Sequence, residues 1–390
     1  MYLHFFKGFK IELENLSDDI KLIIECCKTE KNYTLLENII LQIKDWNKFI
    51  NLSYSHGVFP LVYHTLKEFQ DQIPIQVLAK LKSINLDIAK QNMLMTSELI
   101  KVMKLLEENY INAIAFKGPI LSQMAYGDIT LRQYVDLDIL IDEKDLENSI
   151  SLLNKNNYIT DLSMDMLKNK ICFKTLKDIT MIGKFNGVNI EIHWKLFEDK
   201  YNNEKNNILH KKTFINFKEI LTLSNELNIV YLCLHGSKHM WERIEWIIDI
   251  DKICKSQTIN WNKLIELINL SNMKKSIYLG FYLSYTYFNT EFPKEIISSF
   301  QEYNLKNLEI KVINNINYFT SNSNSLYSTR QLMNFQKDLY DSRLDSIYFI
   351  FNTLFKISTE DCLSFNLNKK LSFLLIILKP FRLIKKYFKN

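Results

Sequence analysis

The chain has 390 residues, and its 49 Lys and Arg against 44 Asp and Glu give a formal net charge of +5 at pH 7. Hydrophobic residues make up 47% of the chain and charged residues 24%, a balance that is typical of globular proteins and excludes a largely disordered one. The positive charge is too mild for the clustered basic surface of a nucleic-acid-binding protein, so we predict no strong interaction with nucleic acid.

Glycine and proline are scarce, with 8 and 5 residues, which predicts few tight turns and a mostly helical protein. The six cysteines have no C-x-x-C spacing, so we expect free buried thiols in a reducing cytosol. The first ten residues are too short and too interrupted for a signal peptide, and no apolar run approaches the ~18 residues that span a bilayer. These features predict a cytoplasmic protein.

Residues 1–110 are predicted to form an N-terminal helical region, because apolar residues recur there at three- and four-residue spacing. Pro74 is expected to begin one of these helices, and a further helix is expected from Glu98 to Tyr110. His56 precedes Gly57 at a predicted helix end, where capping or packing is the expected role. The next region, 111–222, is predicted to be the α/β core, and 223–390 a C-terminal helical region.

The core opens with a short apolar strand at 114–116, which breaks at Lys117, Gly118 and Pro119. Proline is tolerated at the first helical position and glycine permits a tight approach, so a helix is predicted from 119 to 126. A second strand is predicted at 135–141. Since side chains alternate along a strand, Asp136 and Asp138 share one face of it, while the apolar residues Val135, Leu137, Ile139 and Ile141 pack on the other.

Two carboxylates on one strand face repel each other, so their pairing requires an explanation. One interpretation is a surface strand at the edge of the sheet that solvates both groups. The other is a hard-cation site, in which Mg²⁺ is held by one or two carboxylates and by substrate phosphates. Strands are depleted in aspartate, and the apolar neighbours of Asp136 and Asp138 argue against an exposed edge, which favours the metal site.

A helix at 144–154 is predicted to follow, and then three short strands, ICFKTL (171–176), TMIGKF (180–185) and VNIEIHW (188–194). Asn186-Gly187 is a strong hairpin turn between the last two. The resulting fold class is α+β, with a small mixed sheet. In the last strand Glu191 and His193 share one face, and Glu191 is either a further site carboxylate or an outward residue on a half-exposed strand.

Helices are predicted to resume after Glu226. His235 and His239 are one helical turn apart, and three roles are open to them: a transition-metal site, structural packing, or contact with a nucleotide or acceptor. Lys238 and Arg243 would add positive charge nearby, and Trp241 and Trp246 are expected in the core. Asp249 is predicted to be a buried partner of a basic residue, and Asp251 to be solvated.

The end of the chain, residues 379–389, is basic and amphipathic. Packing of this tail against the body of the protein is the favoured interpretation. Contact with a membrane surface is the less favoured one.

Several segments together resemble a known family. They are FKGPILSQMAYGD (116–128), DLDILI (136–141), WNKFINLSYSHGVFPLVYHTL (46–66), EIHWKLF (191–197) and LCLHGSKHMWERIEWIIDIDKI (232–253). They are similar to the bacterial uncharacterised nucleotidyltransferases of the polymerase-β-like nucleotidyltransferase superfamily, over about residues 40–260. The resemblance implies Mg-dependent transfer of a nucleoside monophosphate from an NTP substrate to an unidentified acceptor, such as a peptide, a sugar or a small molecule.

For the nucleotide, the resemblance implies phosphates at the N-terminus of the helix 119–126, over Gly118. Lys117 would supply a point charge there, and Arg132 a bidentate grip on phosphate. His193 would contact a phosphate or orient Glu191. The further nucleotide contacts would be His235 and Lys238.

For the metal, the resemblance implies that Asp136 and Asp138 hold one or two Mg²⁺ (or Mn²⁺) ions and that Glu191 completes the second site. Glu191 would also accept the proton of the acceptor. One departure from the superfamily is that Pro119, rather than serine, follows the glycine, which removes a hydroxyl from the phosphate site. Two alternatives therefore stay open: glycosyl transfer from a sugar nucleotide, and a catalytically silent module that binds a nucleotide or a protein.

Overall fold

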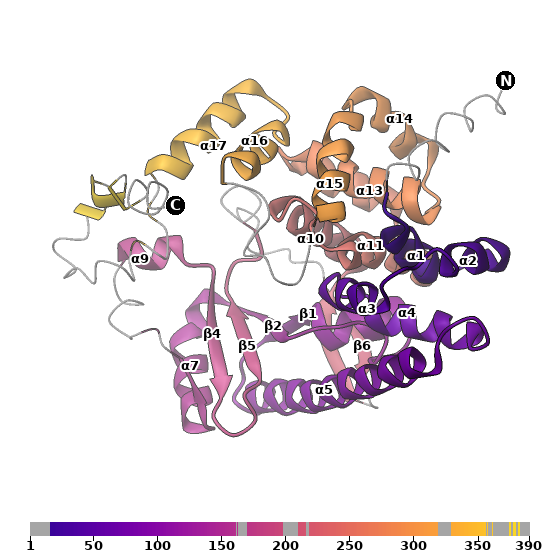
Figure 1. Ribbon diagram of the computed structural model, residues 1–390. Coiled ribbons are helices and arrows are strands. Elements are labelled where there is room, and N and C mark those ends of the chain that lie inside the picture. The colour runs from indigo at the N-terminus through magenta and orange to yellow at the C-terminus, as the bar shows by residue number, and fades with distance from the viewer. Residues whose placement is uncertain are drawn as a thin grey trace.

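The computed structural model describes residues 16–160, 162, 170–197, 210–215, 218–318 and 329–355, and a few later positions, 357, 361, 374, 375, 377–379, 381 and 382. Helices surround a small mixed β-sheet, so the fold class is α+β, as the sequence predicts (Figure 1). Within these residues, no helix combines the length and the apolar character needed to cross a membrane.

The first three helices begin at polar caps, whose side chains accept hydrogen bonds from the first free backbone amides. Asn32 accepts from the amide of Leu35 at 3.1 Å, and Asp45 accepts from the amide of Lys48 at 3.0 Å. The elements are α1 (Asp18–Cys27), α2 (Tyr33–Ile40), α3 (Trp46–Ser55), α4 (Phe59–Leu66), the 3-10 helix η3 (Lys67–Phe69) and α5 (Ile75–Glu108).

The sequence predicts two separate helices between Pro74 and Tyr110, but α5 is continuous for 34 residues. No glycine or proline interrupts this segment, so nothing in it ends the first helix. The long helix packs against β1 (Ala113–Phe116) and β2 (Asp136–Ile141) and runs along one side of the molecule (Figure 1).

The sheet has the strand order β1-β2-β5-β4-β3. Strands β2 and β5 are parallel, and the other neighbouring strands are antiparallel. The remaining strands are β3 (Tyr158–Ile159), β4 (Asp178–Gly183) and β5 (Asn189–His193). The elements between them are α6 (Gly118–Leu121), the π-helix η4 (Ser122–Tyr126), the 3-10 helix η5 (Glu143–Asp145), α7 (Leu146–Lys155) and α9 (Lys170–Thr175).

Four local predictions for the core can be compared with this arrangement. The hairpin at Asn186-Gly187 is confirmed, and Gly187 has the positive φ, +67°, that such a turn requires. The predicted helix 119–126 divides into α6 and η4, and Val135 lies before β2 with 71% of its surface exposed. The predicted strand ICFKTL was wrong, because a short apolar run does not distinguish a strand from a helix, and α9 forms there.

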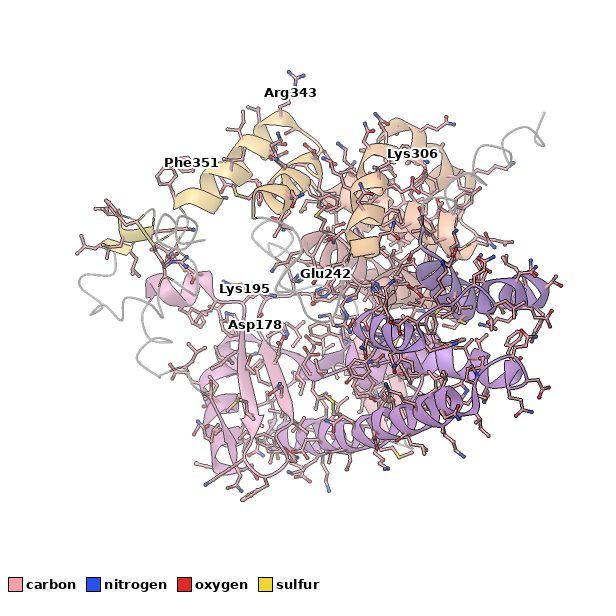
Figure 2. The ribbon with its side chains drawn as sticks, viewed as in Figure 1. Asp178, Lys195, Glu242, Lys306, Arg343 and Phe351 are labelled. Carbon is pink, nitrogen blue, oxygen red and sulfur yellow. The ribbon has the colours of Figure 1, made fainter. Side chains whose placement is uncertain are left out.

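A second, two-stranded sheet consists of β6 (His210–Ile215) and β7 (Lys218–Leu223) and packs against β1. The sequence analysis does not predict it. The C-terminal helices are α10 (Asn225–Lys238), α11 (Ile244–Ser256), α12 (Trp261–Leu270), α13 (Lys274–Phe288), α14 (Lys294–Glu302), α15 (Lys306–Tyr318), α16 (Thr329–Asp338) and α17 (Arg343–Phe355). Helices α10 and α11 lie nearest the sheet, and α13 to α17 extend beyond them (Figure 1). Figure 2 labels Lys306 and Arg343, which begin α15 and α17.

The core between these helices includes both predicted tryptophans, Trp241 and Trp246. Of the cysteines that the structure describes with their side chains, Cys26, Cys27 and Cys233 are buried thiols, as predicted, and Cys254 is half-buried. Most of the basic tail 379–389 lies outside the described residues, and so does its predicted role. The predicted boundaries at 110 and 222 stay predictions.

Candidate active site

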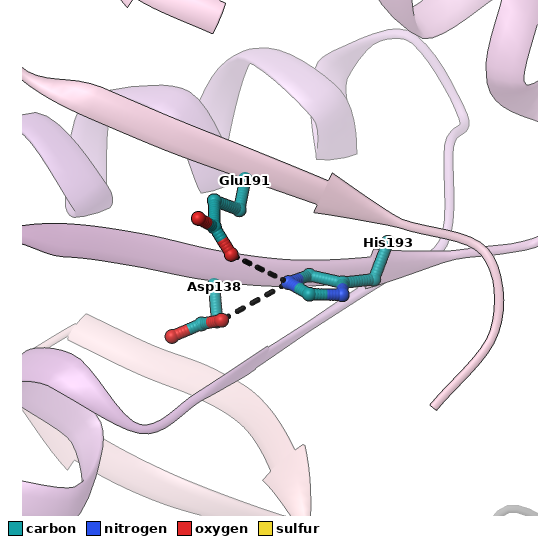
Figure 3. Close-up of side chains that lie close together, drawn as sticks. All are labelled: Asp138, Glu191 and His193. Atoms are coloured by element: carbon teal, nitrogen blue, oxygen red, sulfur yellow. Dashed lines mark hydrogen bonds and ion pairs between the residues drawn. The ribbon is translucent and has the colours of Figure 1, made fainter. Parts of the chain in front are cut away.

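The centre of the site is the parallel pair of strands β2 and β5, which places Asp138 directly opposite Glu191. Because the side-chain period of a strand is two, His193 projects from the same face as Glu191. Figure 3 shows the three side chains converging, with His193 Nε2 3.0 Å from Asp138 Oδ1 and 3.4 Å from Glu191 Oε2. One donor atom of each residue lies within 4.8 Å of the others, which is close enough to share a metal ion.

Asp138 is the buried member of the group, with 1% of its surface exposed. Its Oδ2 atom has no hydrogen-bond partner within the structure, although a buried carboxylate oxygen without a partner is unfavourable. Burial opposes its ionisation, but the charge of Lys117 and the hydrogen bond from His193 hold the pKa of Asp138 below its usual value. An ionised oxygen with a free lone pair fits a cation, so these residues are suited to a divalent ion.

Asp136 precedes Asp138 by two residues on the same strand face and lies outside that closest group. Burial, and next the charge of Asp138, raise the pKa of Asp136 to about 6. The predicted pair therefore consists of one carboxylate that ionises easily and one that ionises only near neutral pH. A nearby cation would favour the ionised form of both.

Lys117 stands between β1 and α6, with its Nζ 3.7 Å from Asp138 Oδ1 and 5.1 Å from the centre of the Tyr231 ring. Although burial opposes the charge, the nearby carboxylate of Asp138 raises the pKa of Lys117, which stays cationic. Its backbone has a φ of +53°, a strained conformation for a residue with a side chain. Such strain is common where the surrounding structure fixes a functional group.

Gly118 shows why glycine is required at the start of α6. Its φ is +41°, and a Cβ atom there would lie 3.2 Å from the backbone oxygen of Asp136. The first turn of α6 therefore lies directly against the strand that carries the aspartates. This close approach brings backbone amides and carboxylates to the same place.

His193 is held from two further sides. Its Nδ1 atom lies 3.7 Å from Asp178 Oδ2, and its ring meets Phe116 edge-on at 5.2 Å between ring centres. Burial disfavours the imidazolium, but the carboxylates of Asp138 and Glu191 raise the pKa of His193. The sequence analysis leaves its role between a phosphate contact and orientation of Glu191, and the structure places it against both carboxylates.

Arg132 is not placed where the sequence analysis expects it. Its guanidinium is buried and makes a bidentate pair with Asp249, with Nε to Oδ1 and Nη2 to Oδ2 both at 2.8 Å. Its third nitrogen, Nη1, donates to the backbone oxygen of Gln133. All three nitrogens are used within the protein, so the predicted grip on phosphate receives no support from the geometry.

Asp249 is thus the predicted buried partner of a basic residue, and it also accepts a hydrogen bond from Tyr126 at 2.7 Å. The prediction for Asp251 was wrong, because this residue is fully buried rather than solvated. Its carboxylate accepts from Thr290 at 2.7 Å and pairs with Lys255 at 2.7 Å. Lys255 lies one turn later on α11 itself, whereas Thr290 follows the end of α13, and the local sequence does not reveal this second donor.

The two predicted histidines, His235 in α10 and His239 at its C-terminal cap, belong to an aromatic ladder that begins at Tyr231. The Tyr231 ring centre lies 5.1 Å from Lys117 Nζ. His235 stacks on Tyr231 with 5.9 Å between ring centres, and both His235 and His239 contact Trp246. Burial, and next the charge of Lys117, lower the pKa of His235 well below its usual value, so the ring is neutral. This packing is one of the roles predicted for the pair.

Three predicted residues remain, Lys238, Arg243 and His56. Lys238 is exposed at the end of α10, and Arg243 pairs with Glu245 at 3.2 Å. His56 caps α3 and is fully buried, with its Nδ1 accepting from the amide of Ile244, in agreement with the predicted capping role.

The sequence analysis misses two residues of the site, Tyr231 and Asp178. A usable signal exists for the first, since Tyr231 lies one helical turn before His235 on the same face of α10. Asp178 precedes the strand predicted at 180–185, so the predicted hairpin does not include it, and the structure pairs it with His193 at the start of β4.

Comparison with known proteins gives a specific family. A sequence model described as "Uncharacterised nucleotidyltransferase" matches residues 43–289, and no curated protein matches the chain. Two solved structures are similar to it. The lincomycin-bound lincosamide antibiotic adenylyltransferase LnuA is 18% identical, with a TM-score of 0.27, and the match covers 34% of this chain and 83% of that one.

The second is an antigenic nucleotidyltransferase-like protein from Paracoccidioides brasiliensis, 12% identical, with a TM-score of 0.30 and coverage of 57% of this chain and 91% of that one. Both TM-scores are low, so the assignment depends on the sequence model, which spans more than half of the chain and the whole of the site described above. The chain therefore belongs to the uncharacterised nucleotidyltransferase family and is a transferase of that class.

Proposed function

We propose that the protein transfers a nucleoside monophosphate from an NTP to an acceptor, in a reaction that depends on Mg²⁺ or Mn²⁺. One observation carries this proposal: Asp138 and Glu191 converge beside Lys117, and a buried oxygen of Asp138 has no partner within the described structure. A divalent cation and phosphate groups are the ligands that such a set of charges attracts. The family membership supports the reaction class.

Asp136, Asp138 and Glu191 are the residues proposed to hold the divalent cation. When bound, the cation would stabilise the charge on the attacking and leaving oxygens at the α-phosphorus. Asp138 is already ionised in the protein, and Asp136 becomes ionised near neutral pH. Both carboxylates are therefore available to a cation at the pH of the cell.

Lys117 is proposed to place a positive charge on the phosphates, which would lie against the backbone amides of the first turn at Gly118. This lysine is held by Asp138 and Tyr231, so its position is fixed before the nucleotide arrives. The proposal omits Arg132, whose nitrogens are used by Asp249 and Gln133.

Two further residues, His235 and Lys238, remain proposed nucleotide contacts, whereas His193, whose Nε2 lies 3.4 Å from Glu191 Oε2, is proposed to orient that carboxylate. His235 is neutral and belongs to the aromatic ladder near Lys117, which suits contact with a flat group rather than with a phosphate. Lys238 is exposed at the end of the same helix, where an additional charge can reach a bound anion.

Glu191 is proposed to accept the proton of the attacking acceptor group. Its side chain is 32% exposed, whereas that of Asp138 is fully buried, so it is the carboxylate of this pair that solvent and an acceptor can reach. A carboxylate beside a metal-bound hydroxyl is a competent general base. The acceptor is proposed to be a peptide, a sugar or a small molecule. The protein itself is proposed to be cytosolic, which its free thiols support.

The test is incubation of the protein with α-³²P-labelled ATP or GTP and Mg²⁺ or Mn²⁺, with pools of peptide, sugar and metabolite acceptors. Transfer of label with release of pyrophosphate is the expected result. Release of a nucleoside diphosphate from an unlabelled sugar nucleotide would instead indicate glycosyl transfer. Binding of nucleotide without any product would indicate a catalytically silent module.

The matched variants are Asp138→Asn and Asp142→Asn. The first removes a charge from the centre of the site, and the second removes one from an exposed aspartate just beyond the same strand. Turnover is expected to disappear in Asp138→Asn and to persist in Asp142→Asn, with both variants folded by circular dichroism. Near-normal turnover in Asp138→Asn would contradict the assigned site.

A further inference from the structure

The group of residues in Figure 3 differs from a purely acidic metal site, because one of its three converging donors is a nitrogen. His193 Nε2 lies at 3.0 Å from Asp138 Oδ1 and 3.4 Å from Glu191 Oε2. Metal–ligand bonds of about 2.1 Å place neighbouring donors of one ion about 3 Å apart when they lie at right angles. The observed separations therefore match donors that share an ion, and Asp138 Oδ2 is a further donor that has no partner among the described residues.

The orientation of the imidazole supports a ligand role. Its other nitrogen, Nδ1, faces Asp178 Oδ2 at 3.7 Å, and the edge-on contact with Phe116 restricts rotation of the ring. Histidine ligands in metal sites commonly direct the second ring nitrogen at a carboxylate, which fixes the tautomer and leaves the first nitrogen free to bind. The same arrangement is present here, since the Asp178 carboxylate faces Nδ1 and the carboxylates of Asp138 and Glu191 face Nε2.

We propose that His193 Nε2 is a metal ligand together with Asp138 and Glu191, and that this mixed nitrogen and oxygen set favours Mn²⁺ or another first-row divalent ion over Mg²⁺. The proposal rests on the metal-dependent function proposed above and specifies its cofactor. Imidazole nitrogen adds affinity for first-row transition ions, whereas Mg²⁺ is bound by oxygen ligands and keeps several waters. His193 thereby determines which ion the site selects, and Asp178 is its positioning residue.

The first experiment is pulsed electron paramagnetic resonance of the full chain with Mn²⁺ alone, without nucleotide. The echo modulation of bound Mn²⁺ is expected to contain a ¹⁴N coupling, and ¹⁵N-labelling of histidine should change it to the ¹⁵N pattern. His193→Gln should remove the coupling, whereas His64→Gln, on the surface helix α4, should retain it. The labelled wild-type protein shows by itself whether a histidine binds the ion, and the two variants assign that histidine.

The second experiment measures competition between the two ions by calorimetry. In the wild-type protein Mn²⁺ is expected to bind at least about tenfold more tightly than Mg²⁺, and His193→Asp, which makes all three donors oxygen, should reduce that ratio to near one. Asp178→Asn should weaken Mn²⁺ binding by about tenfold or more while keeping the nitrogen coupling.

Two results would overturn the proposal in different ways. Mn²⁺ bound without any nitrogen coupling would show that His193 only donates a hydrogen bond to the carboxylates, and the metal-dependent transfer would still stand. Absence of any divalent-ion binding, with or without nucleotide, would remove both this proposal and the proposed function.

Discussion

At the scale of single residues, the two aspartates of β2 share one strand face but have opposite pKa shifts. Asp138 is paired with Lys117 and His193, which hold its pKa below the usual value despite its burial. Burial and the charge of its neighbour raise the pKa of Asp136 to about 6. Similar side chains two residues apart therefore have opposite effects on the stability of the metal-free protein.

The first prediction concerns Asp136→Asn, which should stabilise the metal-free protein at pH 8. A carboxyl whose folded pKa is raised favours folding below its unfolded pKa, near 4, and loses that contribution as the pH rises through 6. The wild-type protein at pH 8 bears this cost, roughly 2–3 kcal/mol for a shift of about two units, and the variant does not. Urea unfolding in a chelating buffer at pH 8 and pH 4.5 measures the difference, which should shrink in acid.

Asp138→Asn should have the opposite sign in the same assay, because its carboxylate is stabilised in the folded protein and its loss leaves Lys117 buried beside a neutral group. Equal effects of the two variants at pH 8 would contradict the assigned shifts.

The second prediction concerns the pH dependence of metal binding. Asp136 must lose its proton to bind a cation, so the component of affinity that depends on it should decrease about tenfold per pH unit below 6. Calorimetric titration with Mn²⁺ between pH 5 and 8, in the wild-type protein and in Asp136→Asn, isolates this component. The pH slope near 6 should be shallower in the variant, and identical slopes would exclude Asp136 as a ligand.

The third prediction concerns Lys117. Lys117→Gln should raise the KM for the NTP by about 10- to 100-fold, which corresponds to loss of a hydrogen bond between charged groups, about 1.5–3 kcal/mol. Lys144→Gln, which removes an exposed charge just after β2, is the control and should leave KM unchanged. Initial-rate kinetics with varied NTP at saturating metal separate KM from kcat. A change in kcat alone would argue against a phosphate contact.

At the scale of elements, helix α11 holds the turn that carries the candidate phosphate site. Asp249 binds both Tyr126, the last residue of η4, and Arg132, just before β2. At the C-terminal end of α11, the side chains of Ser256 and the following Gln257 donate to the backbone oxygen of Met124 at 3.0 and 2.7 Å. The segment between the first turn of α6 and the metal-binding strand is therefore fixed at both ends by a single helix.

The fourth prediction follows from this arrangement. Asp249→Ala leaves the guanidinium of Arg132 buried without its carboxylate and should destabilise the protein by about 3–5 kcal/mol. Asp338→Ala, which removes one partner of the partly exposed pair with Lys311, is the control and should cost less than about 1 kcal/mol. Denaturant unfolding of both variants measures the contrast.

A double variant separates stability from positioning. Arg132→Met with Asp249→Leu removes both buried charges and should recover most of the lost stability. If α11 positions the turn, kcat should nevertheless remain low in this double variant. Recovery of both stability and kcat would reduce the pair to a purely structural role.

At the scale of the whole molecule, the N-terminal helical region contacts α11. The amide of Glu245 donates to the backbone oxygen of His56 at 3.2 Å, and Lys252 donates to Thr29 at 2.8 Å. Gly57 lies so close that a Cβ atom would be 1.7 Å from Glu245 Oε2. Segments separated by almost 190 residues are thereby packed without space for a methyl group.

The fifth prediction uses two glycines with the same backbone conformation. Gly57 and Gly127 both have a φ of +75°, but nothing lies within 4 Å of a Cβ atom at Gly127. Gly127→Ala should therefore cost only the backbone strain, about 1 kcal/mol, whereas Gly57→Ala should cost clearly more because Glu245 and Arg243 must move. Thermal unfolding of the two variants compares these costs, and equal losses would show that the contact is soft.

The parts of the fold that the sequence predicts are those with a strong period or a strong turn. The alternation in 136–141 and 189–193 and the Asn186-Gly187 turn identify the strands that carry Asp138, Glu191 and His193. Their convergence follows because both strands present these residues on one face. The residues whose contacts the sequence does not reveal are mostly those that pair with a partner far away in the chain.

Arg132 is the clearest example, since its basic side chain near the aspartates favours a phosphate contact in the sequence, and only the packing of α11 supplies Asp249. The same limit applies to Asp251, because its partner Thr290 lies 39 residues further along the chain, and a local pattern gives no signal for such a contact. Asp178 lies just outside a strand of the predicted hairpin, and the β6–β7 hairpin was missed although its two strands are neighbours in the sequence.

The π-helical turn at Ser122–Tyr126 has a consequence for the length of the chain in this family. A π-turn accommodates one residue more than an α-helical turn of the same extent, and each added residue rotates all later side chains by about 100° around the axis. Tyr126 is the last residue of this turn, and its phenol donates to Asp249 at 2.7 Å. Relatives that are one residue shorter here should have a regular helix at this point, and in them the tyrosine or its aspartate partner should be absent.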